Sequence, residues 1–279
     1  MSPTVTRLVF SDLDGSLLDH YSYSYEAAKP QIEALERAGI PLILVSSKTR
    51  AEILTLRTEL ANRHPFIVEN GAAVFVPTDY FAEQPANTAE RDGYWVREFA
   101  PPRSQWLAIL ADLRQEFLGC FDNFDNAGVA GIMSMTGLSE QQAVAANQRE
   151  YSEPVRWLAD PEQEAQFVLR LQAAGATAAR GGRFISVSGL CDKGRALAWL
   201  RGHYPLAEGQ MAIDDLAIGD SVNDAPMLEQ AGTAVVVRSP VHDYPTLTRS
   251  QRVIYTDSCG PAGWDEGVSR WLQSNNNFT

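Results

Sequence analysis

Two aspartates near the start of the chain, Asp12 and Asp14, stand two residues apart directly after a short apolar run. The run, residues 8–10, predicts a buried strand, and alternate side chains of an extended chain point to the same side. Carboxylates held so close repel each other, and one pKa rises, unless a cation lies between them. The pair therefore indicates a Mg²⁺-dependent phosphoryl-transfer site, with Asp12 as the nucleophile and Asp14 as the proton-transfer group. An acidic turn that closes a strand would carry the same pattern.

Three later stretches carry further polar residues of the kind that such a site needs. They are residues 44–48, 192–194 and 218–224, and the first and third each follow an apolar run and precede an expected helix. Together with residues 10–18, and in this order, they resemble the motifs of the haloacid dehalogenase (HAD) superfamily of phosphotransferases. The resemblance covers nearly the whole chain.

The elements that must position these residues alternate regularly along the first part of the chain. Apolar residues at helical spacing follow short continuous apolar runs. The expected order is a strand at 8–10, a helix at 26–38, a strand at 41–45, a helix at 49–62 and a strand at 66–68. This rhythm predicts an α/β fold with a doubly wound parallel sheet, in which ligands bind beyond the carboxyl ends of the strands.

The composition changes after residue 77. Residues 78–104 are rich in proline, glycine and polar residues and predict a linker with irregular structure. Helices at 104–117, 139–149 and 161–174 and strands at 155–158 and 183–188 then suggest a second, smaller α+β layer. We expect a HAD-like catalytic core of residues 1–83 and 190–279, with an inserted cap domain at 84–189. Its place in the chain resembles the C2B class of HAD caps.

The resemblance implies a Mg²⁺ site built from four aspartates. Asp12 would supply a carboxylate oxygen, Asp14 its main-chain carbonyl and Asp220 a second carboxylate, which suits the preference of Mg²⁺ for oxygen ligands. Asp224 would support this set directly or through water. Its position also fits a helix N-cap, and the two roles do not exclude each other.

Phosphate binding in the superfamily needs a fixed cation and a hydroxyl donor. Lys193 is the expected cation, although a lysine at a helix start is often only a solvated surface residue. Either Ser46 or Ser47 would donate a hydroxyl hydrogen bond, and the motif does not choose between them. The ion pumps of the superfamily carry threonine at the position of Asp14, so the aspartate here argues for hydrolysis.

A closer likeness is to the family of mannosyl-3-phosphoglycerate phosphatases, which convert that compound to mannosylglycerate, a compatible solute. It rests on residues 12–19 with the tyrosine-rich loop that follows, and on residues 46–49, 69–72, 149–154 and 181–184. The substrate of that family carries a carboxylate as well as a phosphate. The resemblance therefore implies a further set of binding residues, namely Lys48, Glu69, Asn70, Arg149 and Arg183.

The two arginines of this set would reach from the cap to the carboxylate of the substrate. Arginine suits this role because it binds a carboxylate through two parallel hydrogen bonds. Arg149 would otherwise be a surface charge at a helix end, and Arg183 part of a tight hairpin. Three alternatives stay open: a phosphatase of another glycosyl-glycerate or sugar phosphate, a phosphomutase, and a non-catalytic binding protein. Measured release of inorganic phosphate separates a phosphatase from a phosphomutase, and the presence of all four motifs argues against a non-catalytic binding protein.

Composition excludes several classes of partner. The 279 residues carry a formal net charge of −12, with a pI of about 4.8, which disfavours binding to nucleic acid or anionic membranes. No apolar stretch reaches the roughly 18 residues of a membrane span, and the first residues lack the apolar segment of a signal peptide. The three cysteines fit free thiols, and the four histidines fit surface or packing residues. We expect a cytoplasmic enzyme with a small phosphorylated substrate, of open oligomeric state.

Overall fold

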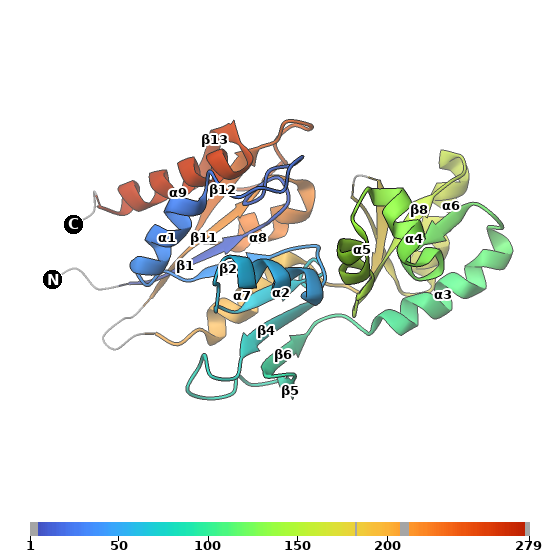
Figure 1. Cartoon of the computed structure of the whole chain (residues 1–279), viewed down its shortest axis with the longest axis horizontal. Coiled ribbons are helices and arrows are strands. Elements are labelled where there is room, and N and C mark those ends of the chain that lie inside the picture. The colour runs from blue at the N-terminus through green and yellow to red at the C-terminus, as the bar shows by residue number, and fades with distance from the viewer. Residues whose placement is uncertain (1–4, 182, 207–211, 277–279) are drawn as a thin grey trace. The chain divides into compact units, whose positions relative to one another are not determined.

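The computed structural model describes residues 5–181, 183–206 and 212–276 (Figure 1). The chain divides into two compact units, which we call the first and second units. The first comprises Met1–Ser46, Asn62–Arg97 and Asp192–Thr279, and the second comprises Ser47–Ala61 and Glu98–Cys191.

The first unit is built on a nine-stranded sheet with the strand order β13-β12-β11-β1-β2-β3-β4-β6-β5. Neighbouring strands from β13 to β3 run parallel. The chain moves outward from β1 in one direction through β2 and β3 and in the other through β11, β12 and β13, so the topological switch point lies beside β1. The strands are β1 (Thr6–Ser11), β2 (Leu42–Val45), β3 (Phe66–Val68), β4 (Ala73–Pro77), β5 (Ala89–Arg91), β6 (Tyr94–Glu98), β11 (Ile213–Gly219), β12 (Thr233–Arg238) and β13 (Val253–Cys259).

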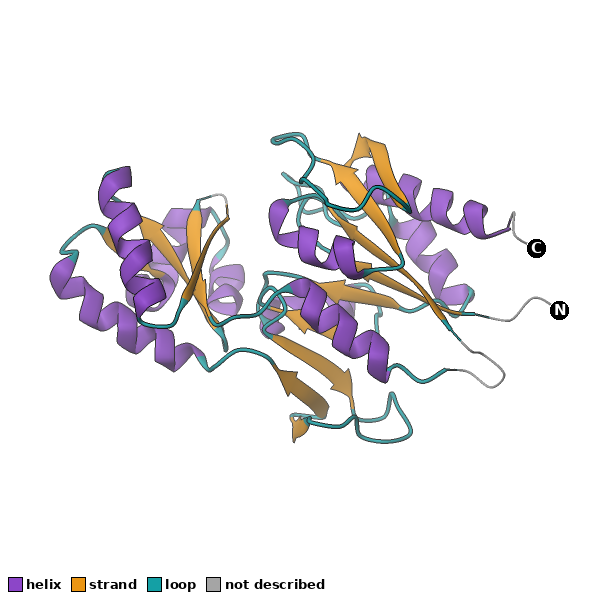
Figure 2. Ribbon diagram, turned by 180° about the vertical axis from the view of Figure 1, so that it is seen from behind, coloured by secondary structure: helices purple, strands orange, loops and turns teal. Residues whose placement is uncertain are grey.

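Helices cover both faces of this sheet (Figure 2). Helices α1 and α9 pack together on one face, and α7 and α8 pack together on the other. The predicted doubly wound α/β fold is thereby confirmed. The helices are α1 (Lys29–Arg37), α7 (Lys193–His203), the 3₁₀ turn η1 (Val222–Asp224), α8 (Ala225–Gln230) and α9 (Gly260–Asn276).

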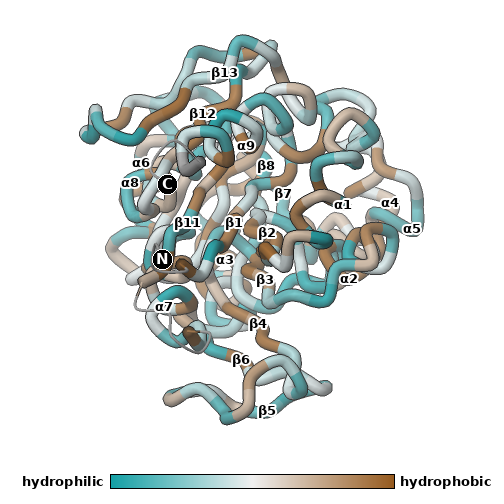
Figure 3. The backbone as a smooth tube through the Cα atoms, turned by 90° about the vertical axis from the view of Figure 1, so that its left-hand side faces the viewer, coloured by the Kyte–Doolittle hydropathy of each residue, from teal (hydrophilic) through white to brown (hydrophobic). Residues whose placement is uncertain are grey.

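The central strands read as continuous apolar runs because both of their faces are covered. Leu8, Val9 and Phe10 of β1 are fully buried, and these strands are the hydrophobic stretches of Figure 3. Helix α9 buries Trp264 completely and directs its Nε1 to the Ser11 hydroxyl, which accepts a hydrogen bond of 2.9 Å. Each such apolar side chain contributes about 1.5–3 kcal/mol to stability on burial. This packing stabilises the carboxyl end of β1.

The second unit has its own four-stranded antiparallel sheet, with the order β7-β8-β10-β9. Its core joins Trp106, Phe117 and Phe167 to the sheet residues Val155 and Ile185. The strands are β7 (Phe121–Asn123), β8 (Ser152–Trp157), β9 (Thr177–Gly181) and β10 (Phe184–Ser188). The helices are α2 (Arg50–Glu59), α3 (Arg103–Glu116), α4 (Phe124–Thr136), α5 (Glu140–Asn147) and α6 (Pro161–Ala173).

The division between the units differs from the expected cap at 84–189. The segment 78–104, expected to be irregular, contains β5 and β6, and their hairpin extends the large sheet beyond β4. The second unit therefore begins at Glu98, and it also includes Ser47–Ala61, because α2 packs against α5. Among the helices of the described ranges, none is long and apolar enough to cross a membrane.

Candidate active site

The carboxyl ends of β1 and β11 bring two of the predicted aspartates together. The strands are parallel neighbours, with Ser11 opposite Ile218, and the Asp12 amide continues the ladder by donating to the Ile218 carbonyl at 2.8 Å. Asp12 and Asp220 each follow one of these strands, so both lie at the same sheet edge. Carboxylate oxygens of Asp12, Asp220 and Asp224 lie within 4.8 Å of one another, and all three residues are buried.

Lys193 lies inside this acidic cluster. It is the first residue of α7, whose N-cap Asp192 accepts a hydrogen bond from the Arg195 amide at 2.8 Å. The Lys193 Nζ is fully buried and lies 2.5 Å from Asp12 Oδ1 and 2.5 Å from Asp224 Oδ1. Burial by itself would lower the pKa of Lys193, but the two carboxylates outweigh it and raise that pKa above its ordinary value. The two carboxylates thus favour the ammonium form of Lys193.

The remaining negative charge suits a divalent cation. Burial first, and then the neighbouring Asp224 carboxylate, raise the pKa of Asp12 well above its ordinary value and that of Asp220 to about 7, although Lys193 opposes both shifts. Asp220 Oδ1 is buried and has no hydrogen-bond partner among the described residues. These raised pKa values show that one ammonium does not compensate three ionised carboxyl groups, and a bound cation would favour their ionised forms. Because the donors are all oxygen atoms, a hard cation such as Mg²⁺ fits this set.

Both carboxylate oxygens of Asp224 accept hydrogen bonds from other residues. Oδ1 accepts from Lys193, and Oδ2 accepts from the amides of Asp220 and Ser221 at 3.1 and 3.0 Å. Although Asp224 precedes α8, its side chain makes no capping hydrogen bond to that helix. Asp224 therefore does not cap α8, but its carboxylate accepts from the Ser221 amide as part of a capping box at η1 and so holds the loop that carries Asp220.

The turn after Asp14 depends on a glycine. Gly15 has φ +86°, and a Cβ at this position would lie 2.5 Å from Asp220 Oδ2. We expect Gly15→Ala to destabilise the protein by about 1–3 kcal/mol through backbone strain, and to lower activity because Asp220 must move. Thermal unfolding and phosphatase assays measure the two effects.

Gly39→Ala is the matched control, because Gly39 has φ +65° but no described heavy atom lies within 4 Å of its Cβ position. The control should share the strain and keep its activity. Equal activity in the two variants would show that the contact with Asp220 is unimportant.

The predicted phosphate-binding serines fall in different units. Ser46 follows β2 and is buried in the first unit, where its carbonyl accepts from the Asn70 amide at 2.9 Å. Ser47 belongs to the second unit, where its carbonyl accepts from Arg149 Nη2 at 2.7 Å. Both contacts use the main-chain carbonyls of the serines, so they do not choose between the two hydroxyls, and the roles of Ser46, Ser47 and the neighbouring Lys48 stay predictions.

Glu69 and Asn70 lie in a tight turn after β3. Both have positive φ, 46° and 60°, and Glu69 is buried. Asn70 Oδ1 accepts from Asn223 Nδ2 at 3.0 Å, which links this turn to the loop that carries Asp220. Gly71 packs so tightly against the start of α7 that a Cβ would lie 2.1 Å from the Asp192 carbonyl oxygen. The turn therefore lies beside the helix that presents Lys193.

Arg149 and Arg183, which are expected to bind the substrate, make hydrogen bonds within the second unit. Arg149 Nε donates to Ser152 Oγ at 3.1 Å, in addition to its bond to Ser47. Arg183 is exposed and donates to the carbonyls of Met135 and Thr136 at 3.1 and 3.4 Å, at the end of α4. Both therefore have a structural partner, and their roles toward a substrate stay predictions.

The sequence did not predict that His242 lies beside Asp220. His242 is exposed, as expected of a surface residue, and in addition its Nε2 lies 3.4 Å from Asp220 Oδ2. No motif spacing marks it. The available signal was its place in the loop that follows β12, the parallel neighbour of β11.

Comparison with known proteins agrees with this architecture. A family model described as haloacid dehalogenase-like hydrolase matches residues 9–90. Over 272 residues, covering 98% of this chain and 99% of the relative, the sequence is 34% identical to a glucosyl-3-phosphoglycerate/mannosyl-3-phosphoglycerate phosphatase from Methanococcoides burtonii.

Solved structures share the fold at lower identity. A phosphatase of the HAD superfamily from Bacteroides thetaiotaomicron is 19% identical with a TM-score of 0.64, over 97% of this chain and 95% of that one. The sucrose-phosphatase from Synechocystis, solved with sucrose and phosphate, is 15% identical with a TM-score of 0.58, over 96% of this chain and 99% of that one. At these identities the likeness shows the fold alone.

Proposed function

Because the chain belongs to the haloacid dehalogenase-like hydrolase family and is a phosphatase, we propose that it hydrolyses mannosyl-3-phosphoglycerate to mannosylglycerate and inorganic phosphate. The identity of 34% to a relative named for this activity supports the choice of substrate. The chemistry rests on one observation, the buried Lys193 ammonium 2.5 Å from the Asp12 carboxylate. The glucosyl analogue is the second candidate, since the name of the same relative includes it.

Asp12 is the nucleophile in this proposal. One of its carboxylate oxygens attacks the phosphorus atom, the bond from phosphorus to the glycerate oxygen breaks, and an aspartyl-phosphate forms. Because burial raises the pKa of Asp12, nearby positive charge is needed to keep its carboxylate ionised. Lys193 supplies a fixed ammonium that also offsets the charge of the incoming phosphate, and a Ser46 or Ser47 hydroxyl completes the phosphate site.

Asp14 moves the protons. It donates a proton to the departing glycerate oxygen and then accepts one from the water that attacks the aspartyl-phosphate. That second displacement breaks the bond between Asp12 and phosphorus and releases inorganic phosphate. The acid at this position is what distinguishes rapid hydrolysis from a long-lived phosphoenzyme.

Mg²⁺ would be held by the carboxylates of Asp12 and Asp220 and by the main-chain carbonyl of Asp14, with Asp224 in support. When bound, it neutralises negative charge on the transferred phosphoryl group. The buried, unpartnered Asp220 Oδ1 supports this assignment.

The second unit acts as the cap in this proposal. Together with Lys48, Glu69 and Asn70, it binds the parts of the substrate other than the phosphate. In this proposal Arg149 and Arg183 bind the glycerate carboxylate and the sugar. The partner is a small phosphorylated metabolite in the cytoplasm.

A panel of phosphate esters tests the proposed function. Inorganic phosphate release should give the highest kcat/KM with a hexosyl-3-phosphoglycerate, and lower values with 3-phosphoglycerate, hexose phosphates and an aryl phosphate. A higher kcat/KM for a hexose phosphate would contradict the proposed substrate and identify the hexose phosphate as the better one. Isomerisation of a hexose phosphate without phosphate release would show a phosphomutase.

Arg183→Ala tests the assignment to the cap. A hydrogen bond to a charged group contributes about 1.5–3 kcal/mol, so kcat/KM for mannosyl-3-phosphoglycerate should fall roughly ten- to a hundredfold. An aryl phosphate, which lacks the carboxylate and the sugar, should be hydrolysed as before. Arg180→Ala is the matched control, because Arg180 is also exposed, and it forms an ion pair with Glu164. Equal losses on both substrates would mean that Arg183 only stabilises the end of α4.

A further inference from the structure

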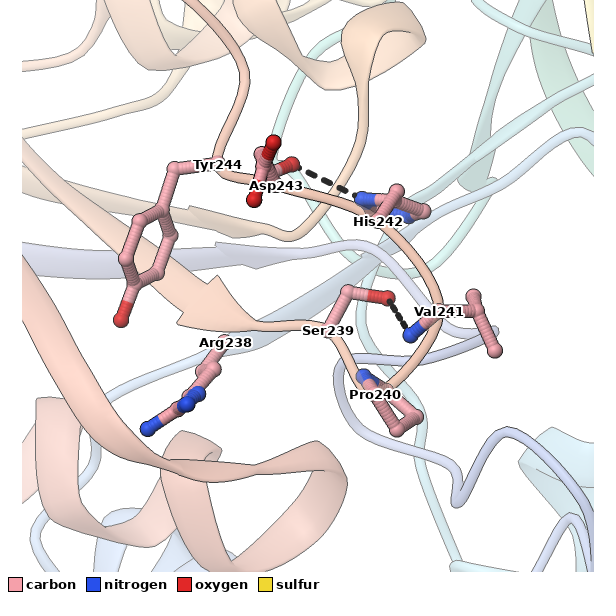
Figure 4. Close-up of a pocket in the computed structure, with 7 residues that line it drawn as sticks. All are labelled: Arg238, Ser239, Pro240, Val241, His242, Asp243 and Tyr244. Carbon is pink, nitrogen blue, oxygen red and sulfur yellow. Dashed lines mark hydrogen bonds between the residues drawn. The ribbon is translucent and has the colours of Figure 1, made fainter.

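The loop that follows β12 reaches the edge of the sheet where the candidate metal ligands lie. Strands β11 and β12 are parallel, with Gly219 opposite Val236, so the loops that follow them start side by side. The loop curves around an open concavity of about 650 Å³ that residues 238–244 line (Figure 4). It therefore belongs to the same edge as Asp220, although no sequence motif marks it.

Both ends of this loop are fastened to one residue of β13. At the start, the Arg238 amide donates to Thr256 Oγ1 at 3.1 Å, and at the end Tyr244 Oη donates to the Thr256 carbonyl at 2.6 Å. Thr256 is fully buried, and the Tyr244 ring packs edge-on against Tyr255 with 5.1 Å between centroids. Both ends of the loop are thus attached to β13.

His242 is the residue of this loop that faces the cluster. Its Nδ1 donates to the Asp243 carbonyl at 2.9 Å, which fixes the orientation of the ring (Figure 4). Its Nε2 lies 3.4 Å from Asp220 Oδ2, and 39% of the side chain is exposed. Because Nδ1 already donates, Nε2 donates to this oxygen in the protonated imidazolium, in which both ring nitrogens carry hydrogen. The same Oδ2 atom lies against Gly15.

The two oxygens of Asp220 therefore have different surroundings. Oδ2 lies between Gly15 and His242, whereas Oδ1 is buried without a hydrogen-bond partner among the residues that the structure describes. A carboxylate that binds a metal through one oxygen is commonly oriented by a polar group at the other. We propose that His242 is a positioning residue that holds Asp220 Oδ2 and so presents Oδ1 to the divalent cation.

This inference rests on the proposed Mg²⁺ site, and its test therefore measures binding of the metal rather than turnover. Isothermal titration of the metal-free enzyme with Mg²⁺, at one fixed pH, gives the dissociation constant. Loss of a residue that orients a metal ligand typically costs about 10–100-fold in metal affinity. We expect His242→Ala to weaken Mg²⁺ binding within that range, and His242→Gln, whose amide N–H can still donate to Oδ2, to recover most of it.

Val241→Ala is the control for the loop, since Val241 is its exposed neighbour and carries no polar group. It should leave the dissociation constant unchanged. An affinity for Mg²⁺ in His242→Ala within twofold of the wild type overturns the inference, as does an equal loss in Val241→Ala. Absence of Mg²⁺ binding by the wild-type enzyme would instead overturn the metal site itself, and with it this role of His242.

Discussion

Asp12→Asn should abolish phosphatase activity and leave the fold intact. The amide cannot attack phosphorus as a carboxylate does, and loss of a nucleophile typically lowers kcat by a factor on the order of 10⁴–10⁶. The shape of the side chain is preserved, and Lys193 keeps its second partner, Asp224, at 2.5 Å. Because burial and the Asp224 charge already disfavour an ionised Asp12, we expect little change in the free energy of unfolding. Initial rates and thermal unfolding measure the two quantities.

Asp79→Asn is the control for charge, because Asp79 is an exposed aspartate of the same unit. It should have wild-type activity. Acid-quenched wild-type enzyme should carry an acid-stable, base-labile phosphoryl group on the peptide that contains Asp12, and Asp12→Asn should carry none. Activity of Asp12→Asn within tenfold of the wild type, or full activity in excess chelator, would contradict the mechanism.

The sequence predicted the first unit well because its signals are local. A continuous apolar run such as residues 8–10 has one stable place, inside a covered parallel sheet, and the residues that follow must then lie at its carboxyl edge. Parallel pairing of β1 with β11 brings Asp12 and Asp220 together across more than half of the chain. The motifs therefore predict that Asp12 and Asp220 lie at one edge of the sheet, as they do in the structure.

Elements with weak local signals were missed. Helix α4 contains Gly128, which has φ +61° inside the helix, and Gly131, so its helical propensity is low. Strands β5 and β6 lie in a segment whose proline and glycine content suggested a linker, and they gain stability only by joining the edge of the large sheet.

Side-chain partners were the least predictable feature of the site. The substrate-binding roles of Arg149 and Arg183 stay predictions, and the sequence did not indicate the main-chain carbonyls that accept hydrogen bonds from them. His242 and Asp220 likewise meet only because β11 and β12 are neighbours in the sheet. Residue spacing within one stretch carries no information on such contacts between distant segments.

Lys193→Met should impair both stability and catalysis. Methionine fills a similar volume without the ammonium, so the buried carboxylates of Asp12 and Asp224 lose a partner that each contacts at 2.5 Å. Removing one member of a buried ion pair costs about 3–5 kcal/mol, and loss of a fixed group that stabilises the transition state lowers kcat by roughly 10²–10³. Lys29→Met, at an exposed lysine of the same unit, is the control and should change neither quantity.

A double variant separates the two effects of Lys193. In Lys193→Met with Asp224→Asn, one uncompensated carboxylate is gone, while the asparagine oxygen can still accept from the Asp220 and Ser221 amides as Asp224 Oδ2 does. We expect urea unfolding to show recovered stability, a coupling of the kind that residues in one ion-pair network display. Activity should stay low, because no cation faces the phosphate. Recovery of activity together with stability would show that Lys193 serves only to neutralise buried charge, and would remove it from the phosphate site.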